Sequence, residues 1–259
     1  MQIPLYQVDA FTSRVFRGNP AAVCPLEGWL PDAQLQSIAA ENNLSETAFF
    51  VRNGNRYDLR WMTPTTEVDL CGHATLASAF VILTYLDPSK DAVTFDSQSG
   101  ELIVRRKGEA LSLDFPARPP QPCQPHPDLV PALGGAPAEI LAARDYMAVY
   151  GTEAEVRALA PHMERLAAVD RFAVIVTAPG QHSDFVSRFF APARGVPEDP
   201  VTGSAHCTLI PYWSARLGRK QLRAFQASRR GGELECEDCG ERVTIAGRAV
   251  LYLQGRIHI

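Results

Sequence analysis

The feature of this sequence that most constrains its fold is an internal repeat. Three pairs of segments match in the same order along the chain: LRWMTP (59–64) with SRFFAP (187–192), CGHATLA (71–77) with TGSAHCT (202–208), and FDSQSGEL (95–102) with FQASRRGGEL (225–234). Arg60 and Arg188 are 128 positions apart, Gly72 and Gly203 131, and Leu102 and Leu234 132. Such a nearly constant offset indicates two copies of one structural unit.

Each copy predicts the same order of elements: a strand, an amphipathic helix, two strands, a wholly apolar helix and a β-meander. The apolar helices are expected over 73–86 and 204–217, and Pro211 should kink the second. A helix without a polar face is buried, so each sheet has to curve around its helix. We therefore predict an α+β fold of two pseudo-symmetric domains, each a curved antiparallel sheet or open barrel around a central apolar helix.

The domain boundaries follow from the repeat. The first domain is expected over 1–116 and the second over 138–259, with a terminal strand near 248–259 that could return to the first domain. The proline-rich segment 117–137 is interpreted as a linker, because proline cannot continue a helix or a central strand. The amphipathic helices are expected over 31–43 and 153–168. The active site is expected in the cleft between the two domains.

Bulk properties exclude several classes of protein. The net charge is −4 without a basic block, which argues against a nucleic-acid partner. The longest apolar stretch, ATLASAFVILTYL, has 13 residues and is too short to cross a membrane. The first residues lack the pattern of a signal peptide, so we expect a cytoplasmic protein that binds no membrane.

The six cysteines are scattered through a large chain, so reduced thiols are expected. Cys236 and Cys239 form one CxxC, but a zinc ribbon needs a second pair of ligands. We interpret this motif as a turn between two strands and expect no metal site.

Both apolar helices begin at a glycine, and the first turn of a helix carries unpaired N–H groups and a positive dipole end. Such a terminus binds anions. The amides at Gly72-His73 and Gly203-Ser204 are therefore candidates for binding a small carboxylate. The positive dipole end should also disfavour protonation of His73. Alternatively, these glycines only permit tight turns.

The copies differ in ways that indicate chemistry. Aligning Ala48 with Ala173 places Glu46 opposite Arg171, so only the first copy has a carboxylate at the start of this strand. A glutamate beside apolar strands can serve as a general acid or base, although a capping or surface glutamate is the simpler alternative. Asn43 and Ser45 flank it and could hold it by hydrogen bonds.

The cysteines differ between the copies as well. Cys71 precedes the first glycine, whereas Thr202 precedes the second, so a racemase with one thiol on each side of its substrate does not fit. Cys207 is expected in the core. His206 could face the core or the cleft.

Several motifs, namely GNPAAV, NLSETAFF, RWMTPTTEVDLCGHATLA, SRFFAP, EDPVTGSAHCTL and ASRRGGEL, resemble those of the PhzF (phenazine-biosynthesis-like) family over nearly the whole chain. The resemblance implies the diaminopimelate-epimerase-like fold and a homodimer. It also implies isomerase chemistry without a cofactor, as in the phenazine-pathway enzyme acting on 2,3-dihydro-3-hydroxyanthranilate. It implies catalytic roles for Glu46, Asp199 and His73. The substrate-binding residues that it implies are Asn19, Ser45, Cys71, Gly72, Gly203 and Ser204.

The sequence therefore favours an isomerase or epimerase that moves a proton on a small carboxylate-bearing substrate, with Glu46 as general acid and base. One alternative is an amino-acid racemase or epimerase that is assisted by Cys71. Another is a non-catalytic protein that binds small molecules. A hydrolase using Glu198 and Asp199 is less favoured, because neighbouring positions in the sequence do not imply paired carboxylates.

Overall fold

The computed structural model describes residues 1–259, which form two compact units. The first unit comprises residues 1–114 and 246–259, and the second comprises residues 115–245. The segment 117–137 is therefore part of the second unit rather than a separate linker. Its apolar residues explain this, because Leu129, Ala132 and Leu133 are buried in the core of that unit.

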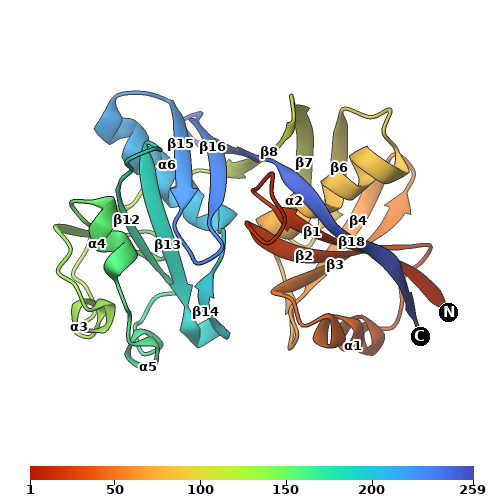
Figure 1. Cartoon of the computed structure of the whole chain (residues 1–259), viewed down its shortest axis with the longest axis horizontal. Coiled ribbons are helices and arrows are strands. Elements are labelled where there is room, and N and C mark those ends of the chain that lie inside the picture. Colours follow the sequence, from red (N-terminus) through yellow and green to blue (C-terminus); the bar gives the residue numbers. More distant parts are fainter. The chain divides into compact units, whose positions relative to one another are not determined.

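The first unit contains these elements: β1 (Gln2–Ala10), β2 (Asn19–Leu26), α1 (Asp32–Asn42), β3 (Glu46–Asn53), β4 (Arg56–Met62), β5 (Glu67–Val68), α2 (Gly72–Val81), the π-helical turn η1 (Ile82–Leu86), β6 (Ala92–Ser97), β7 (Gly100–Lys107), β8 (Ala110–Pro116, whose last residues belong to the second unit) and β18 (Ala249–His258). The second unit contains β9 (Gln121–Pro122), α3 (Leu129–Leu133), β10 (Glu139–Ala142), β11 (Tyr146–Val149), α4 (Glu153–Ala158), α5 (Met163–Leu166), β12 (Val174–Pro179), β13 (Phe185–Ala191), the 3₁₀ turn η2 (Pro192–Arg194), β14 (Val196–Asp199), α6 (Gly203–Leu217), β15 (Gln221–Gln226), β16 (Gly232–Asp238) and β17 (Arg242–Gly247) (Figure 1).

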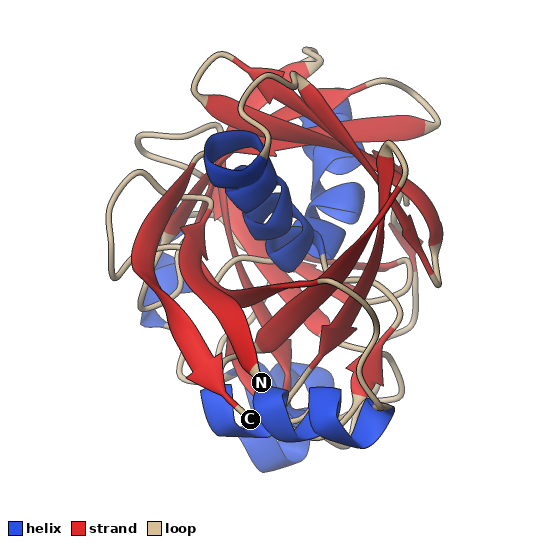
Figure 2. Cartoon of the chain, turned by 90° about the vertical axis from the view of Figure 1, so that its right-hand side faces the viewer, coloured by secondary structure: helices blue, strands red, loops and turns tan.

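Strand pairing in the first unit is mixed. β1 pairs antiparallel with both β2 and β18, so the two ends of the chain lie side by side (Figure 2). β2 pairs parallel with β3 across α1, and β4 pairs parallel with β6 across α2. Parallel neighbours need such crossover connections. The remaining pairs, including β3 with β4 and β6 with β7, are antiparallel.

The second unit repeats this order of pairings. β10 and β11 are antiparallel, β11 and β12 are parallel, and β12 and β13 are antiparallel. β13 then pairs antiparallel with β14 and parallel with β15 across α6. The expected α+β fold of two related units is confirmed, but each sheet is mixed rather than purely antiparallel.

Helix α2 is enclosed by its own unit. It packs against β1, β2, β3, β7 and β18, and Figure 2 shows a helix surrounded by strands. Nearly every residue of α2 is buried, and Thr75 and Ser78 satisfy their hydroxyl groups by donating to carbonyl groups of the preceding turn. The predicted absence of a polar face is therefore explained by the wrapping of the sheet.

The single helix expected over 153–168 is instead two short helices, α4 and α5. Pro161 lies between them and explains the break, because proline lacks an N–H and keeps the preceding residue out of the helical region. Helix α6 in contrast runs continuously through Pro211.

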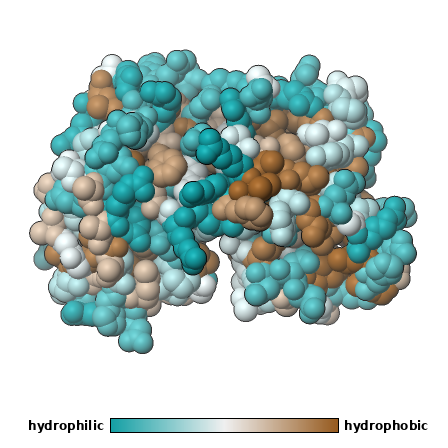
Figure 3. Space-filling view, viewed as in Figure 1, coloured by the Kyte–Doolittle hydropathy of each residue, from teal (hydrophilic) through white to brown (hydrophobic).

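The CxxC motif lies at the end of β16, where Cys236 is buried and Cys239 is exposed in the turn to β17. The predicted turn is confirmed, and all six cysteines are free. The helices are all too short or too polar to serve as membrane spans. Hydrophilic residues cover most of the face in Figure 3, with apolar patches among them, chiefly over the elements of the first unit.

Candidate active site

The start of α2 carries one half of the candidate site. Cys71 occupies the N-cap position with an extended backbone, and its carbonyl accepts hydrogen bonds from the N–H and hydroxyl of Thr75. No side chain caps the helix. The first amides, which begin at Gly72 and His73, therefore have no side-chain acceptor and suit an external anion. Gly72 is half-buried and the side chain of His73 is buried.

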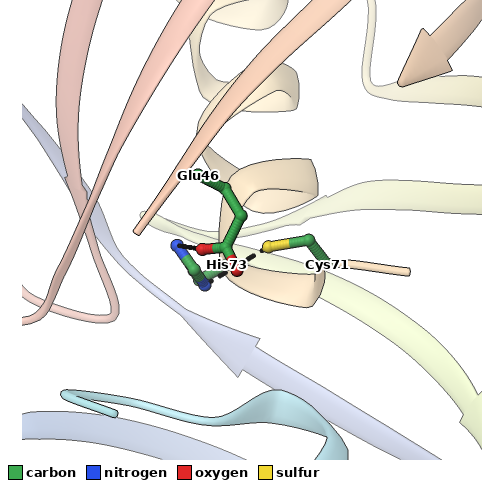
Figure 4. Close-up of side chains that lie close together, drawn as sticks. All are labelled: Glu46, Cys71 and His73. Carbon is green, nitrogen blue, oxygen red and sulfur yellow. Dashed lines mark hydrogen bonds and ion pairs between the residues drawn. The ribbon is translucent and has the colours of Figure 1, made fainter. Parts of the chain in front are cut away.

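Glu46 supplies the other half. It is the first residue of β3 and pairs with Ala21 of β2. Its carboxylate Oε2 lies 3.2 Å from Nε2 of His73 (Figure 4). The Glu46 side chain is 16% exposed and that of His73 is 5% exposed. The contact is thus a largely buried ion pair whose carboxylate retains an open side.

Two further groups reach the other ring nitrogen of His73. The side-chain amide Nδ2 of Asn19, at the start of β2, lies 3.2 Å from Nδ1 of His73, and Sγ of Cys71 lies 3.5 Å from the same atom. Asn19 is fully buried. Both contacts hold the ring so that Nε2 faces Glu46.

Charges in this cluster follow from burial and proximity. Burial raises the pKa of the Cys71 thiol to about 11, and the negative charge of Glu46 acts in the same direction. Burial disfavours the charged form of His73, but its interactions with Cys71 and Glu46 outweigh burial, so the pKa of His73 is well above its ordinary value.

One sequence expectation fails at this point. The helix dipole was expected to disfavour protonation of His73, but despite burial the interactions with Cys71 and Glu46 raise the pKa of His73 well above its ordinary value. Asn43 ends α1 in a left-handed conformation, and Ser45 is half-buried in the turn before β3. Hydrogen bonds from these two residues to Glu46 stay a prediction.

Strand register identifies the equivalent positions in the second unit. Arg60 pairs with Phe49 and Arg188 pairs with Val176, so Glu46 corresponds to Ala173 rather than to Arg171. The start of α6 places Ser204 at the position of His73. The carboxylate and imidazole of the first unit are therefore replaced by a methyl group and a hydroxyl.

The neighbouring acidic residues Glu198 and Asp199 have different partners. The carboxylate of Glu198 accepts hydrogen bonds from the Arg188 guanidinium at 2.7 and 3.1 Å. Glu67 accepts from Arg60 in the same bidentate way, with both distances 2.7 Å. Glu198 is thus the second copy of a repeated ion pair that fastens a short strand to its neighbour.

Asp199 belongs to a different network. Its carboxylate accepts a hydrogen bond from the hydroxyl of Thr202. The buried side chain of Gln226 accepts from the Thr202 N–H at 2.8 Å and donates to the Asp199 carbonyl at 2.8 Å. Gln226 therefore fixes the loop that leads into α6, and sequence reasoning missed it because its partners are distant along the chain.

The start of α6 resembles that of α2. Thr202 is its N-cap residue, no side chain caps the helix, and Gly203 is buried. The Ser204 hydroxyl accepts a hydrogen bond from Arg144 at 3.2 Å. Arg144 also pairs with the buried Asp145. No sequence signal identified Arg144, because its contact depends on a separation of 60 residues.

His206 and Cys207 lie in the core. His206 is fully buried, and the short distance of 2.8 Å shows that its Nδ1–H donates to the carbonyl of Thr202. Cys207 is buried one turn into the helix.

The cluster of Glu46, Cys71 and His73 in the first unit could hold a metal ion. Each residue offers one ligand atom, and these three atoms lie within 4.8 Å of one another.

Two related units, each with mixed strand pairing and a buried helix, define an epimerase-like α+β fold. A predicted epimerase from Pseudomonas aeruginosa shares this fold, with a TM-score of 0.73 at 17% identity over 99% of both chains. A family model described as phenazine biosynthesis-like protein matches residues 8–255. The chain belongs to this PhzC-PhzF family.

Relatives match over their full length. An uncharacterized isomerase from Pseudomonas aeruginosa is 53% identical over 259 residues, which cover all of both chains. The crystal structure of a PhzF-family protein from Enterococcus faecalis superposes with a TM-score of 0.98, at 49% identity and with full coverage of both chains.

Proposed function

We propose that this protein is a cofactor-independent isomerase or epimerase that moves a proton on a small carboxylate-bearing substrate. The observation that carries the proposal is the ion pair between Glu46 and His73 beside the uncapped start of α2. It unites a proton acceptor with N–H groups that can stabilise negative charge. The isomerase name of the Pseudomonas aeruginosa relative supports the same class of reaction.

The chemistry requires one group that both takes and returns a proton. The Glu46 carboxylate removes a proton from a carbon that is acidified by a carboxyl group or a conjugated double bond. The electron pair of the broken C–H bond moves into that conjugated system. The amides at Gly72 and His73 stabilise the charge that develops, and the carboxylic acid of Glu46 then returns its proton to a carbon.

The comparison of the two units favours a single base. Ala173 and Ser204 stand where the first unit has Glu46 and His73, and Thr202 stands where it has Cys71. None of these three residues carries a carboxylate or a thiol. One base that acts on one side of the substrate suits the transfer of a proton between positions better than a two-thiol inversion.

We also propose substrate-binding roles for residues of both units. In the first unit these are Asn19, Ser45, Cys71 and Gly72. In the second they are Asp199, Gly203 and Ser204, because the uncapped start of α6 repeats that of α2. Asp199 would orient an amine or hydroxyl group of the substrate.

The test is a screen for proton exchange in deuterated water. Small amino, hydroxy and unsaturated carboxylic acids are incubated with the protein, and deuterium incorporation is read by mass spectrometry. We expect incorporation into at least one substrate, and a loss of about 100-fold or more in Glu46→Gln. Glu41→Gln is the matched control, because Glu41 is exposed on the neighbouring helix α1.

Retention of exchange in Glu46→Gln would contradict the assignment of the base. Binding of acids without deuterium incorporation would support the alternative of a non-catalytic binding protein. A racemase assisted by Cys71 is the second enzymatic candidate, because Sγ of Cys71 contacts the same imidazole as Glu46. That candidate requires Cys71→Ser to be inactive.

We further propose that the protein acts in the cytoplasm as a homodimer. Six free cysteines suit a reducing compartment. Val15, Phe16, Tyr252 and Leu253 are exposed, and the rings of Phe16 and Tyr252 meet edge to face. A second copy that covers these residues would remove apolar surface from water. Light scattering after size-exclusion chromatography should give the mass of two chains. The mass of one chain would contradict the homodimer.

A further inference from the structure

We propose that Glu46, Cys71 and His73 form a zinc-binding site and that Zn²⁺ blocks proton transfer by occupying it. The metal site stands on the structure of the first unit alone. Its inhibitory effect rests on the proposed function, because Glu46 is the proposed base.

The ligand set is the first argument. A thiolate, an imidazole nitrogen and a carboxylate oxygen are the groups that Zn²⁺ takes in proteins. Hard cations such as Mg²⁺ and Ca²⁺ prefer sites made only of oxygen atoms. A site with one sulfur, one nitrogen and one oxygen ligand therefore favours zinc over these more abundant cations.

The distances are the second argument. Tetrahedral zinc separates a nitrogen and an oxygen ligand by roughly 3.3 Å, and a nitrogen and a sulfur ligand by roughly 3.6 Å. The three residues can offer one ligand atom each within 4.8 Å of one another. Glu46 Oε2 lies 3.2 Å from Nε2 of His73, and Cys71 Sγ lies 3.5 Å from Nδ1 of the same ring. Because an ion binds only one ring nitrogen, either Cys71 or Glu46 has to move closer to that nitrogen when zinc binds.

Burial and support are the third argument. The side chains of Cys71 and His73 are buried, and both residues lie at the start of α2, which is enclosed by strands. Glu46 is held by the pairing of β3 with β2. The backbone positions of the ligands are thus fixed, and only a side chain has to move when the ion binds. The partial exposure of Glu46 supplies a path of entry, and three protein ligands leave a fourth position for water.

Occupation of the site has a defined chemical balance. The Cys71 thiol loses its proton to solvent as the zinc–sulfur bond forms, and a lone pair of the imidazole and one of the carboxylate complete the protein ligands. No oxidant or reductant takes part. The Glu46 oxygen that binds the ion can no longer accept a proton from a substrate.

The test uses the full-length protein after removal of metals by chelation. Zinc binding is measured by calorimetry, and Co²⁺ is used as a spectroscopic probe that shows thiolate-to-cobalt charge transfer. We expect one ion per chain and a charge-transfer band. Cys71→Ser should lose the band, and His73→Asn should weaken binding by on the order of 100-fold.

The matched control is Cys239→Ser, because Cys236 and Cys239 form the CxxC motif and Cys239 is the exposed cysteine. This variant should keep the band. A band that survives in Cys71→Ser, or that disappears in Cys239→Ser, overturns the proposal. Thermal melting confirms that each variant is folded. If either single variant unfolds, the double variant Cys236→Ala/Cys239→Ala is used instead. It lacks both CxxC thiols and should keep the charge-transfer band.

Failure of the metal site can be told apart from failure of the proposed function. The cobalt spectrum needs no substrate, so it reports the site even if no exchange activity is found. If exchange is found, zinc should abolish it and a chelator should restore it. Exchange that is unaffected by saturating zinc overturns the inhibitory role and leaves the assignment of Glu46 intact.

Discussion

Glu46 Oε2 and His73 Nε2 lie 3.2 Å apart in the first unit, while strand register and the starts of α2 and α6 place Ala173 and Ser204 at the equivalent positions of the second. Both units therefore have the same fold, but only the first has the acid–base pair. This asymmetry makes the pair the part of the molecule whose removal should affect chemistry more than folding.

His73→Asn should lower the rate of deuterium exchange by about 100-fold, because the positive partner of the Glu46 carboxylate is lost. The measurement is kcat for exchange at substrate saturation. Ser204→Ala is the comparison at the equivalent position of the second unit, and it should change KM more than kcat. Equal effects of both variants on kcat would contradict a single acid–base pair.

Asn19→Leu should lower kcat by about fivefold, since one buried hydrogen bond to His73 Nδ1 is worth about 1 kcal/mol. Leucine keeps the volume of the side chain but cannot hold the imidazole of His73 through its Nδ1 atom. A positioning role predicts a changed pH profile of kcat as well as a lower maximum. A lower melting temperature with an unchanged pH profile would indicate a purely structural role.

Glu198→Gln should destabilise the fold by about 1–3 kcal/mol, because it leaves the mostly buried guanidinium of Arg188 without its charged partner. Glu67→Gln should have a smaller effect, because Arg60 keeps its ion pair with Asp32. The measurement is the free energy of unfolding in urea. Asp199→Asn should instead raise KM with a smaller effect on stability. A strong loss of kcat in Glu198→Gln, with folding intact, would restore Glu198 as a candidate for chemistry.

Cys71→Ser should retain exchange activity within about threefold if one base suffices, because burial raises the pKa of the thiol to about 11 and leaves it protonated at neutral pH. The readout is the rate of exchange and of any stereochemical inversion, followed by chiral chromatography. Complete inactivity of a folded Cys71→Ser protein would favour the cysteine-assisted racemase.

The stability of the protein should fall as the pH decreases from about 6.5 to about 4. Burial lowers the pKa of His206 to about 4, so below pH 6.5 the unfolded chain binds a proton that the folded chain excludes. Stability is therefore complete above the unfolded pKa and decreases by about 3 kcal/mol down to the folded pKa.

The His206 prediction is checked by urea unfolding at a series of pH values. His206→Gln should flatten this part of the pH dependence, whereas His182→Gln, which changes an exposed histidine, should not. An unchanged slope in a folded His206→Gln protein would show that other groups bind the proton.

By itself the sequence determined the duplication, the buried helices α2 and α6, and the candidate residues Glu46 and His73. These features depend on local periodicity and on motifs that repeat at a constant offset, so they can be read along one chain. The break between α4 and α5 was missed although Pro161 signals it, because the apolar pattern on both sides suggested one helix.

Only the tertiary structure decided which atoms meet. It paired Glu198 with Arg188, made Ala173 the structural equivalent of Glu46 and returned β18 to the first unit. It also brought Cys71 and Glu46 to the imidazole of His73, and despite burial their interactions raise the pKa of His73 well above its ordinary value, against the direction expected from the helix dipole. Electrostatic energy depends on distance and burial, and neither quantity is encoded in the spacing of residues along the chain.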